Sequence, residues 1–126
     1  MSGLKSLWVG CYSAGPISDA GLKELVRRCR RATAARPVGV FAVTDFLAMR
    51  VMRALGGTGR TVGREVLLIG YDDLDAAAET DPPLTTVHQP FREEGRVAVA
   101  KILGTVYGRS EESAVIPVRL VVRETA

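Results

Sequence analysis

The stretch that decides the fold is VLLIGYDD at residues 66–73. Five of its first six residues are apolar or aromatic, which predicts a strand buried on both faces of a parallel sheet. The stretch ends on two carboxylates, Asp72 and Asp73. Because ligands bind beyond the carboxyl ends of the strands in open α/β sheets, we expect a binding site here.

The rest of the chain continues an alternation of strands and helices. The expected elements are, in chain order, a strand at 4–12, a helix that Ser18 or Asp19 caps and that ends at Arg36-Pro37, a strand at 38–43, a helix at 45–55 that Asp45 caps and Gly56-Gly57 stops, the strand at 66–71, a short strand after Pro82-Pro83, a helix at 92–107 and closing strands at 115–123. This order predicts a three-layer α/β fold with a parallel core.

The composition is that of one soluble globular domain. A chain of 126 residues can bury a single core, and its 47% hydrophobic and 25% charged residues exclude a disordered protein. The net charge of +3 permits contact with nucleic acid, but a solvated Arg-rich surface explains it better. Cys11 and Cys29 lack metal-ligand spacing, so free thiols are expected rather than a disulfide or a zinc site. The N-terminal apolar run is too short for a signal peptide or a membrane span, which predicts a cytoplasmic protein with no membrane partner.

Four segments of the chain carry motifs in a fixed order. They are VFAVTDFLAM at 40–49, GYDD at 70–73, PPLTTVHQP at 82–90 and VRLVVRET at 118–125. Together they resemble the effector-binding core of LacI/GalR-type bacterial transcriptional regulators, and the resemblance extends over residues 15–126. Any one motif is weak, but four in register argue against chance.

The resemblance implies a fold and a domain organisation. The sensor of such regulators is a type I periplasmic-binding-protein-like domain, in which two similar subdomains hold the ligand between them. Residues 1–126 look like a single domain, the incomplete C-terminal half of this effector-binding and dimerisation domain. The helix at 92–107 would normally belong to the missing first subdomain. No helix-turn-helix is visible, so we expect an excised piece or the product of a truncated gene, with DNA contacted only through the missing N-terminal motif.

The resemblance also assigns roles to four candidate ligand-binding residues. Asp72 would accept hydrogen bonds from a sugar hydroxyl or a base amine, a task that suits the two acceptor oxygens of a carboxylate. Its alternative is a residue that ends a strand and caps a turn, which is the role expected of Asp73. Thr44 replaces the family's ligand-binding Asn, and Gln89 would join the ligand's hydrogen-bond network or be merely exposed. Ile17 occupies a position where sugar-binding members often have a stacking aromatic, which argues against a simple hexose effector.

The resemblance implies a regulator and not an enzyme. The chain would bind a small polar metabolite, sugar or nucleoside-like, and the resemblance implies pairing through residues 46–55 and 74–80. The apolar stripe of the 92–107 helix, uncovered without the first subdomain, would add to the formation of a homodimer or a larger oligomer. We expect no catalytic group, cofactor or metal, and His88 is expected to be a structural imidazole.

Two alternatives remain open at the level of sequence. The first is an enzyme, because Asp72, Asp73 and Thr80 resemble the phosphoribosyl-diphosphate loop of phosphoribosyltransferases. Gly70-Tyr71 intervene before the acids, however, and Glu79 would repel phosphate. The second alternative is an association fragment of a truncated gene with no ligand function.

Overall fold

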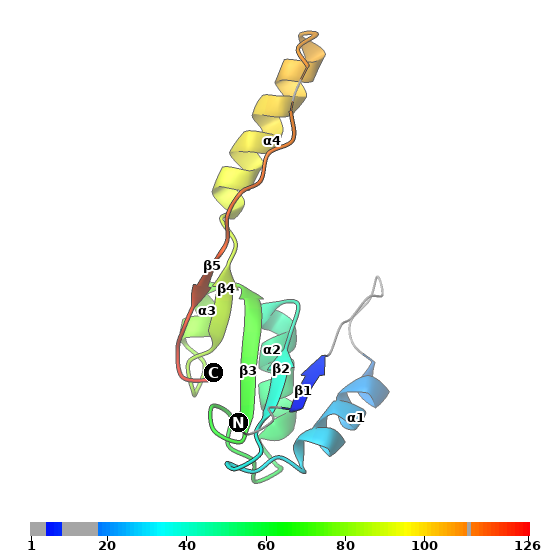
Figure 1. Cartoon of the computed structure of the whole chain (residues 1–126), viewed down its shortest axis with the longest axis vertical. Helices are drawn as coiled ribbons and strands as arrows, with labels where there is room; N and C mark the ends of the chain where they lie inside the picture. The colour runs from blue at the N-terminus through cyan, green and yellow to red at the C-terminus, as the bar shows by residue number, and fades with distance from the viewer. Residues whose placement is uncertain (1–4, 9–17, 111) are drawn as a thin grey trace.

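The computed structural model describes residues 5–8, 18–110 and 112–126. Its elements are β1 (Lys5–Trp8), α1 (Asp19–Cys29), β2 (Val38–Phe41), α2 (Asp45–Leu55), β3 (Val66–Asp72), α3 (Asp75–Ala78), β4 (Thr85–His88), α4 (Phe91–Val106) and β5 (Arg119–Val121). Within these residues the strands form a five-stranded sheet in the order β1-β2-β3-β4-β5 (Figure 1). The expected strand at 4–12 is described only as β1, and its remainder lies outside the described residues.

The sheet is mostly parallel, as the sequence predicts. β1 to β4 run in the same direction, whereas β5 is antiparallel to β4. In the register of β2 with β3, Phe41 pairs with Ile69, so Thr44 and Asp72 follow at the same level. Thr44 and Asp72 therefore lie at the same edge of the sheet.

Helix α1 begins as expected but ends early. The Ser18 side chain caps it by accepting a bond of 3.1 Å from the backbone N–H of Gly21. The helix stops at Cys29 instead of continuing to Arg36-Pro37. The reason is a tight turn between Thr33 and Arg36, whose backbones bond to each other in both directions. This turn returns the chain to β2.

One face of the sheet carries the hydrophobic core. Helix α2 buries one apolar stripe, which consists of Leu47, Ala48, Val51 and Leu55, and Gly56 is its C-cap. The core cluster joins helices α1, α2 and α3 to alternate residues of β2 and β3, and consists of Leu25, Cys29, Ala32, Val40, Ala42, Leu47, Ala48, Val51, Leu55, Val66, Leu68, Ala77 and Leu84.

The opposite face of β3 is less covered than the sequence suggests. Val66, Leu68 and Gly70 are buried, whereas Leu67, Ile69 and Tyr71 between them are only half-buried. The prediction of a strand buried on both faces was therefore wrong for the described part of the chain. The physical reason is that helices α1, α2 and α3 all pack on the side of Leu68.

The C-terminal residues are tied into the sheet by Thr125, which is fully buried. Its hydroxyl donates a 2.7 Å bond to the Leu68 carbonyl and accepts a 2.8 Å bond from the Thr85 N–H. The Leu68 N–H in turn donates to the Thr125 carbonyl at 2.7 Å. Thr125 thus connects β3 and β4 at the end of the sheet opposite to Asp72.

Helix α4 projects away from the sheet, and the segment leading to β5 returns alongside it (Figure 1). Gly104 is buried, and Lys101 donates a hydrogen bond to the Glu112 carbonyl of the returning segment. The other side of the helix is open, because Val99, Ile102, Leu103 and Val106 are 48–71% exposed. None of the helices in the described residues is both long and apolar enough to cross a membrane.

Candidate functional site

A hollow of about 510 Å³ lies where β3 and β4 end and α4 begins. The residues that line it are Asp72, Asp73, Leu74, Asp75, His88, Gln89, Pro90, Phe91, Arg92 and Glu93. It therefore brings together two of the four predicted site residues, Asp72 and Gln89. Thr44 is not among the lining residues, and Ile17 lies outside the described residues.

Asp72 stands at this hollow with an uncommon backbone conformation. Its φ is 120° and that of Asp73 is 59°, both in the region that favours glycine. Such residues cost about 1–3 kcal/mol each and persist where the surroundings enforce them, often at ligand sites. The turn that presents Asp72 is therefore held in place by other parts of the fold.

The electrostatic environment of Asp72 disfavours its charged form. Burial is the main cause that raises the pKa of its carboxyl group, and the negative charge of Asp45 adds to it. A hydrogen bond from the backbone N–H of Asp45 acts in the opposite direction and lowers the pKa of Asp72. A partly desolvated carboxylate of this kind forms strong bonds to the donors of a polar ligand.

Asp73 also lines the hollow, but its side chain is bound to other parts of the fold. Its carboxylate accepts a 2.7 Å bond from Arg123, next to β5, and a 2.9 Å bond from His88 at the end of β4. Burial acts to raise the pKa of Asp73, but the bonds from Arg123 and His88 outweigh it and lower that pKa below its usual value. The side chain caps no helix, because Leu74 occupies the N-cap position of α3. His88 has the structural role that the sequence suggests.

Replacing Asp73 with Asn is expected to destabilise the fold by about 2 kcal/mol at neutral pH, since two charge-assisted bonds are weakened. The folded-state pKa of Asp73 is lowered, so its stabilisation is present above the unfolded pKa of about 3.9 and is lost as the pH falls through the folded value. The difference between the two proteins should therefore vanish in acid. Urea denaturation at several pH values measures it, with Glu79→Gln as an exposed control. A difference that persists unchanged in acid would rule out the ion pair as its cause.

The predicted N-cap of α2 was wrong by one residue. Thr44 is the cap, and its hydroxyl accepts a 3.2 Å bond from the Leu47 N–H. Asp45 is fully buried, and its two carboxylate oxygens accept bonds of 2.9 Å from the Leu74 N–H and 2.6 Å from the Thr86 hydroxyl. Both residues are good N-caps in isolation, so the tertiary partners of Asp45 decide the assignment.

Gly70 leaves the space that the Asp45 carboxylate occupies. A Cβ at residue 70 would collide with the Asp45 Oδ1 atom and would lie 3.1 Å from the Leu84 side chain. The glycine of the GYDD motif is therefore required for close approach of a side chain to β3.

The hollow also includes residues that the sequence reasoning missed. Phe91, Arg92 and Glu93 come from the first turn of α4, and Phe91 is 52% exposed. Gln89 is held beside them, since its side-chain amide donates a 2.9 Å bond to Glu94. These three residues could have been predicted to line the site, because they directly follow Gln89 and Pro90, where the chain leaves β4.

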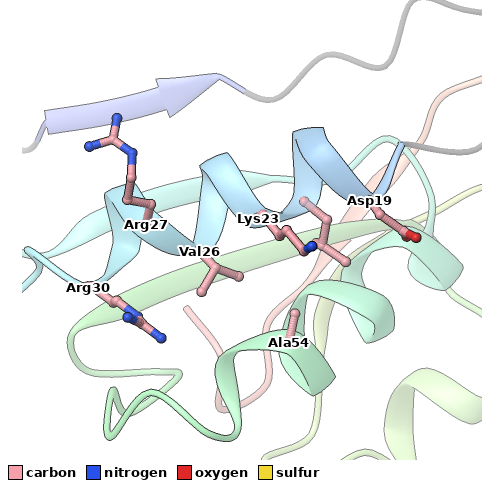
Figure 2. A pocket seen from close by; sticks show the side chains of 7 residues that line it. Asp19, Lys23, Val26, Arg27, Arg30 and Ala54 are labelled. Carbon is pink, nitrogen blue, oxygen red and sulfur yellow. The ribbon is translucent and has the colours of Figure 1, made fainter.

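A second hollow of about 410 Å³ lies between α1 and α2. Four of its labelled side chains, Asp19, Lys23, Val26 and Arg27, come from α1, Arg30 is the C-cap of that helix, and Ala54 comes from α2 (Figure 2). It contains none of the predicted site residues, and its charged residues are exposed. Among the described residues no group of His, Cys, Asp and Glu could hold a metal ion. Cys29 is a buried free thiol as expected, and Cys11 lies outside the described residues.

Comparison with protein families and curated proteins gives consistent matches. The periplasmic binding protein-like domain family matches residues 2–126. The chain is 34% identical over 92 residues to the HTH-type transcriptional repressor PurR of Photobacterium profundum, which covers 71% of this chain and 28% of that protein. It is also 34% identical over 102 residues to the HTH-type transcriptional regulator CelR of Thermobifida fusca, covering 81% of this chain and 27% of that one.

Solved structures agree with these matches. A transcriptional regulator CelR–cellobiose complex is 32% identical, with a TM-score of 0.72, and covers 85% of this chain and 32% of that chain. A Lac repressor dimer bound to operator and the anti-inducer ONPF is 28% identical with a TM-score of 0.72, covering 88% and 39%. The chain thus spans less than half the length of the proteins it matches.

Proposed function

The chain belongs to the periplasmic binding protein-like sensor domains of LacI-family transcriptional regulators, and we propose that it binds a small polar effector through Asp72 and Gln89. The observation that carries this proposal is the hollow at the carboxyl edge of the sheet, which both residues line. The relatives are regulators and not enzymes. The phosphoribosyltransferase alternative is therefore set aside, and Thr80 is a turn residue whose hydroxyl donates to the carbonyls of Ala77 and Pro82.

The chemistry of the hollow favours a neutral or amine-bearing effector. Asp72 and Asp75 make its lining acidic, although Arg92 offsets part of this charge. The carboxylate of Glu93 is paired with Arg96. A phosphorylated or carboxylated ligand would meet like charges, which destabilise binding. A sugar or a nucleoside instead offers hydroxyl or amine donors to Asp72, and the apolar face of the sugar ring or the nucleoside base can stack on Phe91. The CelR relative forms a complex with cellobiose, which agrees with a sugar-like effector.

The effector would act by shifting a conformational equilibrium. In a regulator that contains this domain together with a DNA-binding helix-turn-helix, the ligand would favour one arrangement of the sensor and so change operator affinity. Such a protein works in the cytoplasm, where its operator lies. The Lac repressor relative is bound to its operator as a dimer, which supports this mechanism.

Self-association is the second part of the proposal. Phe46, at the start of α2, is 68% exposed, and it lies in the 46–55 segment for which the sequence predicts a dimer contact. Residues 74–80 and the open side of α4 are the other proposed contacts. An association module without a ligand would share these surfaces but would not need the carboxylate of Asp72 at the hollow.

The test measures operator binding by a regulator that contains this domain. Neutral sugars and nucleosides are compared with their phosphorylated forms, which are matched in size and differ in charge. We expect at least one neutral compound to change operator affinity and its phosphorylated form to have no effect. A response confined to phosphorylated compounds would contradict the proposed site, because its acidic lining repels them.

A further inference from the structure

We propose that Asp45 is a positioning residue for Asp72: its buried carboxylate fixes the turn at the end of β3 so that Asp72 faces the hollow. This inference rests on the proposed function, since it concerns the residue that would contact the effector. It assigns to Asp45 a role that differs from helix capping, which Thr44 already performs.

The contacts of Asp45 hold the turn on both sides. One carboxylate oxygen accepts from the backbone N–H of Leu74, the residue that directly follows Asp72 and Asp73. The other accepts from the hydroxyl of Thr86 on β4, and the same hydroxyl oxygen accepts from the Asp73 N–H at 3.4 Å. Asp45 is therefore hydrogen-bonded directly to the backbone of Leu74, and it is connected to the backbone of Asp73 through the Thr86 hydroxyl.

The turn requires hydrogen bonds from outside it, because two consecutive residues have positive φ. Without outside bonds, Asp72 and Asp73 would relax toward the extended backbone that ordinary residues prefer. Asp45 can supply the bonds because it is fully enclosed and because Gly70 leaves room beside β3. Gly70 and Asp45, 25 positions apart in the sequence, therefore act together to hold this turn.

Asp45 also acts on Asp72 through its charge. The negative charge of Asp45 adds to burial in raising the pKa of the Asp72 carboxyl group. A residue that only stabilised the fold at a distance would alter neither the backbone angles of Asp72 nor its titration. These two quantities therefore separate positioning from general stabilisation.

The test is Asp45→Asn, which keeps the shape of the side chain but removes its charge and one of its two acceptor oxygens. NMR spectra of the folded chain give the amide–Hα couplings of Asp72 and Asp73, which report φ, and the titration of the Asp72 carboxyl carbon. We expect the couplings to move toward those of negative φ and the Asp72 titration to shift to lower pH. Glu79→Gln, an exposed acid outside the hollow, should change neither. Unchanged couplings and an unchanged titration in a folded Asp45→Asn protein would overturn the proposal.

A second pair of variants answers the question if Asp45→Asn fails to fold. Thr86→Val removes the hydroxyl that connects Asp45 to Asp73, whereas Thr86→Ser retains it. We expect altered couplings at Asp73 in the valine variant and normal couplings in the serine variant. Equal couplings in both would overturn the proposal. None of these readouts needs a ligand, so a failure of Asp72 to bind effector would refute the proposed function and leave the positioning role standing.

Discussion

Replacing Asp72 with alanine, in a regulator that contains this domain, is expected to weaken effector binding more than about tenfold and leave operator binding intact. The missing carboxylate leaves donors of the ligand without an acceptor in a partly desolvated hollow, at a cost of about 2–4 kcal/mol. Isothermal titration calorimetry measures the affinity for the effector, and a fluorescence assay measures operator binding. Unchanged effector affinity would make Asp72 a mere turn residue.

The Asp72→Asn variant provides the control for folding. Asn accepts a positive φ more readily than Ala, so the turn should persist. The pKa of Asp72 is raised in the folded state, so ionisation destabilises the fold as the pH rises from the unfolded pKa of about 3.9 through the folded value. The Asn variant should therefore be at least as stable as the parent at neutral pH. Loss of effector binding with undiminished stability would exclude unfolding as its cause.

Most of the fold could be predicted because it depends on local patterns. The apolar stripe of α2 and the apolar run of β3 specify a helix and a strand, and their alternation specifies parallel pairing. The end of α1 could not be found this way, since the Thr33–Arg36 turn that stops it has no periodic signal. The half-open face of β3 was missed because an apolar run does not say which elements cover it.

The position of the candidate site could be predicted from the sequence, but the hydrogen bonds that support it could not. Asp72 was found because it ends a strand, and the carboxyl edge of a parallel sheet is where ligands bind. Asp45 looked like a helix cap, because its true partner Thr86 lies 41 positions away. Arg123, which pairs with Asp73 across 50 positions, gave no signal for the same reason. Hydrogen bonds between polar residues that are far apart in the sequence produce no regular spacing of residues from which they could be predicted.

The open side of α4 leads to a second large effect, which is self-association of this chain. Val99, Ile102, Leu103 and Val106 lie on one side of the helix, and the returning segment contacts the opposite side, around Gly104. In a symmetric pair both copies would bury this stripe. Removing these eight side chains from water, four from each copy, favours association. We therefore expect a dimer or a larger oligomer at tens of micromolar.

Charge placed on the stripe should dissolve this association, whereas charge on the far side should not. Ile102→Lys with Val106→Lys is expected to weaken self-association more than about tenfold, because like charges from both copies would be buried at the contact with no partner. Ala100→Lys is the matched control, since residue 100 is exposed on the other side of the same helix. Sedimentation equilibrium measures both variants against the parent chain. A parent chain that sediments as a monodisperse monomer, with α4 packed against its own sheet, would contradict the prediction, because the stripe would then be satisfied within one copy.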